Sequence, residues 1–154
     1  MKIYQHKTIQ RIPISIEKAW DFFSSPKNLD QITPNDMGFK ILSISGGDKM
    51  YEGQIIHYKV APVAKIPIRW TTEITHVTEG DYFVDEQRFG PYAMWHHEHH
   101  FKQIDGGVEM IDHVHYAIPF GYIGRIANSI FVKSKLKEIF DFRYKKVEEL
   151  FGSI

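Results

Sequence analysis

The segment that decides the fold is YIGRIANSIFVKSKLKEIFDFRYKKVEELF, residues 122–151 of the 154-residue chain. Apolar side chains recur at three- and four-residue steps from Ile123 to Phe151, and neither proline nor glycine occurs from Arg125 to Phe151. This periodicity is typical of an amphipathic helix. The spacing predicts one helix of about thirty residues, which would be about 45 Å long at 1.5 Å per residue. Such a long helix must bury its apolar stripe against another large element.

Working back from this helix, the chain contains runs of residues that are typical of β-strands. A first strand is predicted at residues 2–12, and it is followed by a helix capped by Ser15 and by a second short helix at 26–32. Six further strand-like runs, each ending at turn residues, occupy 39–45, 53–61, 68–77, 82–89, 93–104 and 108–118. We therefore expect a single α+β domain over residues 1–154. Its curved, seven-stranded antiparallel sheet wraps around the long C-terminal helix and leaves a cavity between sheet and helix.

The composition excludes several classes of function. Nineteen basic and nineteen acidic residues cancel, so the chain lacks the positive excess that nucleic-acid binding requires. Cysteine is absent, which excludes disulfides, thiolate nucleophiles and zinc–cysteine sites. No apolar run approaches the length of a membrane span. Aromatic residues make up 14% of the chain and would suit an apolar pocket. These observations predict a cytoplasmic, single-domain protein.

Four local motifs carry a resemblance to a known family. They are IPISIEKAWDFFSSPKNLDQITP (12–34), PIRWTTEI (67–74), FVDEQRFGPYAMWHHEHHF (83–101) and GGVEMIDHVHYAIPFGYIG (106–124). Together with the predicted order of elements they resemble the START/polyketide-cyclase (SRPBCC, Bet v 1-like) superfamily, and within it a bacterial branch of ligand-binding or "cell division inhibitor"-like proteins. The resemblance implies the helix-grip fold. It does not imply a reaction, because this superfamily contains lipid binders, hormone receptors and cyclases.

Residues 96–100, HHEHH, contain four of the nine histidines of the chain. The spacing does not match the helical H-E-x-x-H zinc motif, and no metal or other cofactor is expected. On a strand, alternate side chains point to opposite faces. We therefore expect one row to face the helix and the other to be exposed. The inward row is Trp95, His97, His99 and Phe101, and the outward row includes His96, Glu98 and His100.

The next strand determines which groups lie beside the inward histidines. A two-residue turn at Gly106-Gly107 would pair Asp105 with Val108 and place His99 opposite Val114. Met110, Asp112, Val114 and Tyr116 would then form the inward row, with Asp112 diagonal to His99. A three-residue turn would instead bring His113 opposite His99. The strand at 82–89 can face the helix with either of two rows of side chains. An inward Phe83 would place Asp85 inward as well, whereas an inward Val84 would place Glu86 inward. The sequence leaves both orientations open.

The candidate binding residues combine aromatic walls with a polar patch. They are Tyr58, Trp70, Trp95, His97, His99, Phe101, Asp112 and Tyr116. The first hypothesis is a protein that binds a small apolar or lipid-like ligand between sheet and helix. The alternative is a cyclase, dehydratase or isomerase that uses a histidine with Asp112 as an acid–base pair. A third hypothesis, a partner-binding regulator, rests only on the "cell division" label of the similar bacterial branch. For the polar patch itself, the alternative to both binding and catalysis is a purely structural role, in which Asp112 only holds a histidine. The loops at 61–67 and 118–124 are expected at the mouth of the cavity.

Overall fold

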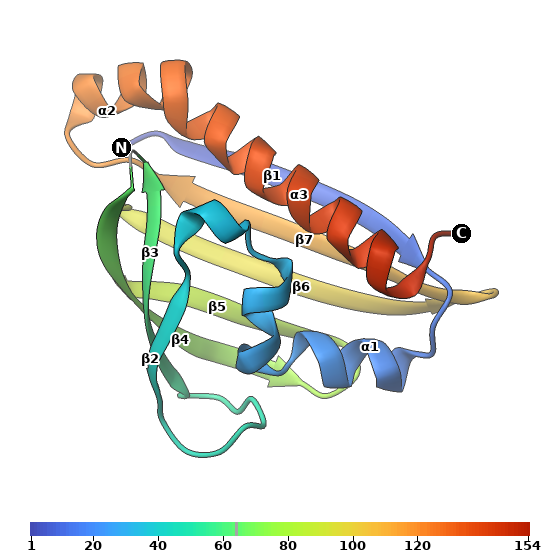
Figure 1. Cartoon of the computed structure of the whole chain (residues 1–154). Coiled ribbons are helices and arrows are strands. Elements are labelled where there is room, and N and C mark those ends of the chain that lie inside the picture. The colour runs from blue at the N-terminus through green and yellow to red at the C-terminus, as the bar shows by residue number, and fades with distance from the viewer. Residues whose placement is uncertain (64) are drawn as a thin grey trace.

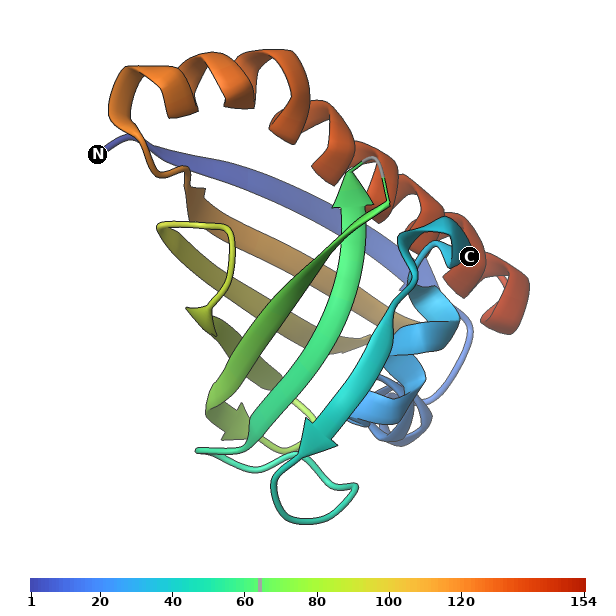
Figure 2. The same cartoon turned by 60° about the vertical axis from the view of Figure 1, so that its left-hand side comes forward.

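The computed structural model describes residues 1–63 and 65–154, and its centre is a seven-stranded antiparallel sheet (Figure 1). The strands are β1 Ile3–Ile12, β2 Lys40–Ile44, β3 Ile55–Val63, β4 Ile66–Thr78, β5 Tyr82–Phe89, β6 Met94–Ile104 and β7 Gly107–Ala117. They lie in the order β1-β7-β6-β5-β4-β3-β2, so β2 to β7 form a meander and β1 pairs with its last strand. Irregular pairing in β2–β3, β3–β4 and β4–β5 bends the sheet, and Figure 2 shows the resulting curvature.

Three short helices follow β1. They are α1 Ile16–Phe23, η1 Pro26–Ile32 and η2 Asn35–Met37, of which the last two are 3₁₀ helices. The side chain of Ser15 accepts a hydrogen bond from the backbone N–H of Lys18 and caps α1, as predicted. Trp20 packs edge-on against the rings of Phe83 and Phe101. This contact fixes α1 over one end of the sheet.

Residues 121–151 form a continuous helical segment, which confirms the predicted long helix. It consists of α2 Gly121–Ala127, the π-helical turn η3 Asn128–Val132 and α3 Lys133–Phe151. The π turn was not predicted from the periodicity. It coincides with a buried hydrogen bond in which the hydroxyl of Tyr116 donates to Asn128 Oδ1 at 3.0 Å. The hydrogen-bond partner of Asn128 thus lies on β7. The π turn therefore coincides with a tertiary contact, which the spacing of residues within the helix could not predict.

The two ends of the long helix differ in how they pack. Leu136, Phe140 and Val147 of α3 are buried against the sheet. In contrast, Ile123 and Ile126 of α2 are 74% and 60% exposed, so the apolar stripe is buried only in its C-terminal part. None of the helices in the described part of the chain is both long and apolar enough to cross a bilayer.

The predicted register of β6 and β7 is wrong by two residues. Gly107 pairs with Ile104, and His99 lies directly opposite Asp112 instead of Val114. The turn is formed by Asp105 and Gly106, because Gly106 takes the positive φ of 79° that a tight turn needs. A shift of two residues preserves which face each side chain points to. The predicted inward rows of both strands are therefore correct although their partners are not.

Gly107 is needed for close packing and not for the turn. A Cβ atom at this position would lie 2.1 Å from the backbone oxygen of Ile12 in the neighbouring strand β1. We predict that Gly107→Ala lowers the free energy of unfolding by about 1–3 kcal/mol, the usual cost of overpacking. Gly47→Ala is the control, because a Cβ there meets nothing within 4 Å. Equal urea midpoints for the two variants would contradict the assignment.

Candidate functional site

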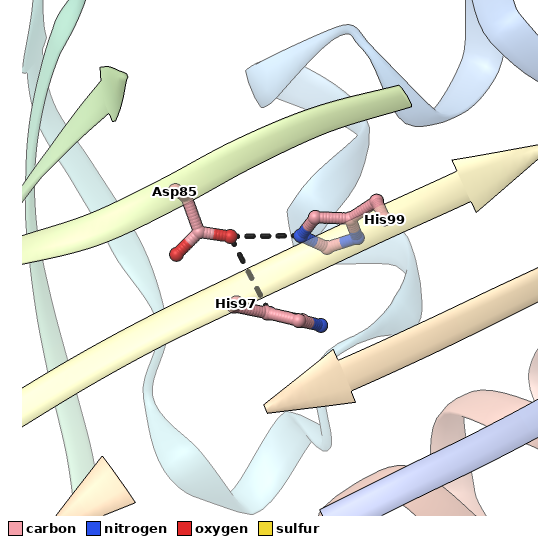
Figure 3. A group of neighbouring side chains, drawn as sticks. All are labelled: Asp85, His97 and His99. Atoms are coloured by element: carbon pink, nitrogen blue, oxygen red, sulfur yellow. Dashed lines mark hydrogen bonds and ion pairs between the residues drawn. The ribbon is translucent and has the colours of Figure 1, made fainter. Parts of the chain in front are cut away.

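Side chains from three adjacent strands meet on the inner face of the sheet. Strand alternation directs His97 and His99 of β6 and Asp112 of β7 toward the helix, and Asp85 of β5 joins them from the other side. Figure 3 shows the carboxylate of Asp85 reaching toward both imidazoles. The orientation that the sequence left open is therefore Asp85 inward, on the same face as the buried ring of Phe83.

The four groups alternate in a closed ring, which we call the His-Asp tetrad (Asp85, His97, Asp112 and His99). The Nε2 atom of His97 is hydrogen-bonded to Asp112 at 2.9 Å, and the Nε2 atom of His99 to Asp85 at 2.8 Å. The remaining nitrogens complete the ring as close ion pairs. His97 Nδ1 lies 3.3 Å from Asp85 and His99 Nδ1 lies 3.0 Å from Asp112. Every imidazole nitrogen thus faces a carboxylate oxygen.

This arrangement favours protonated histidine. In a neutral imidazole one nitrogen carries a lone pair, which would face a carboxylate oxygen at close range and repel it. Burial alone would lower the pKa of His97, but the carboxylates of Asp85 and Asp112 outweigh burial and raise the pKa above 6.5. Burial alone would likewise raise the pKa of Asp85 and Asp112, but His97 and His99 hold both values well below 3.8.

The shifts give the tetrad a defined pH window. The raised pKa of His97 contributes stability that is complete below the unfolded value of 6.5 and is lost as pH rises through the folded value. The lowered pKa values of Asp85 and Asp112 contribute stability that is present above 3.8 and is lost as pH falls through the folded values. Both contributions are complete together only between the unfolded values of 3.8 and 6.5, in mildly acidic solution.

Aromatic side chains shield the tetrad from water. The ring of Phe83 stacks on His99 at a centroid distance of 4.1 Å, and Phe140 of α3 contacts His97 edge-on at 5.6 Å. The indole of Trp95 donates a hydrogen bond to Asp85 Oδ1 at 3.3 Å. Because the side chain of His97 is only 5% exposed, proton exchange with solvent has to pass through its neighbours.

A small cavity of about 80 Å³ touches the tetrad. Its polar lining includes His99, Asp85 and Asp112, together with Tyr58 and Arg143. Apolar side chains from α1, η1, β3, β4, β5 and the segment between β2 and β3 form most of the remaining wall: Phe22, Phe23, Leu29, Ile32, Met50, Ile56, Ile74 and Phe83. We call this space the inner cavity.

Of the eight residues that the sequence proposed, three line the inner cavity: Tyr58, His99 and Asp112. The other five pack in the interior: Trp70, Trp95, His97, Phe101 and Tyr116. The sequence reasoning missed Arg143, whose position on a predicted amphipathic helix gave no signal of a site. It left Asp85 undecided, although the neighbouring Phe83 favoured the orientation observed.

Aromatic residues separate the inner cavity from a second, larger pocket. Tyr58 stacks on Trp70, and Trp70 in turn contacts Tyr92 and Trp95 at centroid distances of 5.4 and 5.3 Å. We call these four residues the aromatic partition. The indole nitrogen of Trp70 is buried and has no hydrogen-bond partner in the described part of the chain.

The second pocket, here called the apolar pocket, has a volume of about 290 Å³. It lies under the first turns of the long helix and is lined by Pro62, Ile68, Ile118, Pro119 and Phe120, among other apolar residues. Both loops that were expected at the cavity mouth contribute to it. Most of residues 61–67 belong to β3 and β4, and Ala64 lies outside the described residues.

The outward row of β6 is less exposed than predicted. The side chains of His96, Glu98 and His100 are 28%, 28% and 40% exposed. His96 contacts Glu86 and Glu98, and His100 contacts Glu98, so mutual ion pairing covers these side chains. The prediction of an exposed row assumed that the side chains do not contact one another, and for this reason it overestimated their exposure.

The donor atoms of Asp85, His97 and His99 lie within 4.8 Å of one another, close enough to gather around a metal ion. Two imidazoles and a carboxylate are a suitable ligand set for Zn²⁺. An ion at this position would compete with the protons of the two hydrogen bonds in the tetrad. The inner site therefore has two alternative chemistries, proton sharing and metal binding, and the hydrogen-bond geometry favours the first.

The fold and site together define a helix-grip protein with a polar cluster beside a small, largely apolar cavity. No protein-family model matches the sequence, and no curated protein matches it. The fold, however, is similar to that of many solved structures. Protein CV1439 from Chromobacterium violaceum is 12% identical with a TM-score of 0.73, covering 98% of this chain and 99% of that chain.

Two plant proteins of the Bet v 1 type are also similar in fold. Major latex-like protein 151 from Panax ginseng is 10% identical with a TM-score of 0.67, and Ara h 8.0201 is 14% identical with a TM-score of 0.65. Each match covers 97% of both chains. The chain therefore has the Bet v 1-like (SRPBCC) fold, as the sequence motifs indicated. The bacterial branch within the superfamily stays a prediction.

We predict that Asp112→Asn lowers the pKa of His97, because a neutral amide removes one of the charges that oppose burial. The same direction is expected for Asp85→Asn. Histidine titration by NMR measures the shift, and Glu86→Gln, which alters a carboxylate on the outer face, is the control. If the titration of His97 is the same in all three variants and the wild type, the tetrad does not form in solution.

Proposed function

We propose that the protein binds a small molecule in the space between the sheet and the long helix, with a polar group of the ligand against the His-Asp tetrad. The observation that carries this proposal is that His99, Asp85 and Asp112 line a cavity whose other walls are largely apolar. A few convergent polar groups in an apolar enclosure are typical of ligand sites.

The volumes limit what the ligand can be. An enclosed apolar space of about 150 Å³ accommodates benzene, so the inner cavity of about 80 Å³ accepts only a small group or the polar end of a longer molecule. The apolar pocket of about 290 Å³ is large enough for a hydrocarbon portion. Within the aromatic partition, Trp70 and Tyr92 lie between the inner cavity and the apolar pocket. A ligand that occupies both spaces therefore has to displace part of this partition.

Two unpartnered donors support a ligand that carries oxygen. The indole nitrogen of Trp70 and Nε of Arg143 are both buried without a hydrogen-bond partner in the described residues. A buried donor without a partner costs free energy, and a ligand oxygen would satisfy it. Arg143 lines the inner cavity and its guanidinium lies over the ring of Phe140 at 5.1 Å. We therefore favour a ligand with an apolar body and a carbonyl, hydroxyl or carboxylate group.

Filling the inner cavity should abolish binding. We predict that Leu29→Trp, which places a larger side chain in the cavity wall, removes a small molecule that native mass spectrometry detects on freshly purified wild-type protein. The matched control is Leu42→Trp, because Leu42 is 45% exposed on β2. Circular dichroism shows whether both variants fold. A ligand that stays bound to folded Leu29→Trp would place the binding site elsewhere.

A second candidate function is acid–base catalysis on the bound molecule. His99 lines the cavity and is hydrogen-bonded to Asp85, an arrangement that suits proton transfer in a cyclase, dehydratase or isomerase. His97 would then act as a positioning residue, because it contacts the carboxylates and not the cavity.

Deuterium exchange separates this enzyme from a carrier. If the tetrad catalyses proton transfer, the wild type in D₂O incorporates deuterium into the ligand extracted from it, and His99→Gln does not. His100→Gln is the control, because His100 is on the same strand but on the outer face. A ligand that binds to the wild type and remains free of deuterium supports the carrier.

A further inference from the structure

The outer face of β6 and β7 carries a second cluster of histidines and glutamates. Strand pairing places Glu98 of β6 opposite His113 of β7, and His96 opposite His115. The rings of His113 and His115 lie 4.2 Å apart, tilted toward each other by 50°. Donor atoms of Glu98, His113 and His115 lie within 4.8 Å of one another. These three residues, here called the outer triad, are half-buried and belong to no part of the cavity wall.

The two imidazoles of the outer triad have few partners of their own. The only side-chain hydrogen bond of His113 within the described residues is a long one of 3.5 Å to Gln5 on β1. For His115 the described residues offer none. Two neighbouring imidazoles with few other side-chain partners form a pair of potential metal ligands, because a neutral imidazole presents a nitrogen lone pair to an ion.

Glu98, in contrast, is held firmly in position. Its Oε2 atom accepts a hydrogen bond from His100 Nε2 at 2.9 Å, and its Oε1 atom lies 3.3 Å from His96 Nε2. His96 is fixed in turn by Glu86 at 3.0 Å. Metal-binding carboxylates are commonly oriented by such outer hydrogen bonds. Each oxygen of Glu98 keeps a lone pair that can face an ion.

We propose that Glu98, His113 and His115 bind a divalent transition-metal ion of the Zn²⁺ class on the outer face of the sheet. Two imidazoles and one carboxylate are the borderline ligands that such ions prefer over Mg²⁺ or Ca²⁺. Tetrahedral geometry with bonds of about 2.0–2.1 Å separates neighbouring donor atoms by about 3.3 Å. Small side-chain rotations bring the donors of the outer triad to that separation, and a fourth coordination position stays open to water.

The sequence predicts that no metal is bound, and this proposal differs from that prediction. That expectation considered the inner histidines and the missing H-E-x-x-H spacing, whereas the outer triad arises from the pairing of β6 with β7. One group opposes the ion: Lys7 of β1 lies opposite His113 in the register. The positive charge of Lys7 lowers the affinity of the outer triad for a metal ion, but the side chain of Lys7 is exposed and can move away from the ion.

The test is calorimetric titration of the full-length protein with ZnCl₂ in a buffer that does not bind metal. We expect one ion per chain. His113→Gln and His115→Gln should each weaken binding by more than the roughly ten- to hundredfold that loss of a supporting group causes. His100→Gln, which removes only a partner of Glu98, should weaken binding within that range. Lys7→Gln should strengthen it. His76→Gln, an exposed histidine on β4, should leave it unchanged.

Two results would overturn the proposal. One is zinc binding of equal affinity in the wild type and in His113→Gln and His115→Gln, or no binding in any of them. The other is zinc binding that is lost in Asp85→Asn but kept in His113→Gln, because the ion then occupies the inner tetrad. NMR signals of His113 and His115 provide an independent readout, since they should shift on addition of one equivalent of Zn²⁺ before those of His97 and His99.

Discussion

The carboxylates of Asp85 and Asp112 lie between the sheet and the long helix. Their burial is possible because the imidazoles of His97 and His99 lie between the two carboxylates. Transferring Asp85 and Asp112 into an apolar interior without partners would cost several kcal/mol each. His97 and His99 offset this cost by alternating with them around a closed ring. The ring joins β5, β6 and β7, so the alignment of these strands and the charge balance of the site depend on one another. A shift of any one of these three strands would leave a buried charge unpaired.

The alternation of side chains along a strand gives β6 and β7 two chemically similar faces with different surroundings. On the inner face, phenylalanine rings cover His97 and His99, and each of their imidazole nitrogens faces a carboxylate oxygen. On the outer face the histidines are reached by water, and His113 and His115 face each other. The inner cluster is therefore suited to hold protons and the outer triad to accept an ion. The same residue type is thus proposed for two different roles, because burial decides which partners each histidine meets.

The parts of this structure that could be predicted from the sequence are those encoded in local periodicity. The long helix, the Ser15 cap and the inward direction of His97 and His99 follow from spacing along one segment. The residues that lie opposite one another on neighbouring strands do not follow from such spacing. The register of β6 and β7 depended on whether Asp105-Gly106 or Gly106-Gly107 forms the turn. Gly106 takes the positive φ that the turn needs, whereas Gly107 packs closely against β1, a contact that local spacing does not contain. Asp85 was undecided and Arg143 was missed for the same reason, because the groups that they meet lie far away in the chain.

The division of the interior into two spaces determines where the structure has to open for a ligand. The tetrad end is closed by buried side chains of α3, including Phe140 and Val147. Over the apolar pocket, α2 buries only Gly124, whose backbone lies so close to Pro119 that a Cβ would meet its oxygen at 2.0 Å. A helix end with few buried apolar side chains has low local stability. Access to the interior is therefore least costly at α2, and a ligand entering there meets the aromatic partition before it reaches the tetrad.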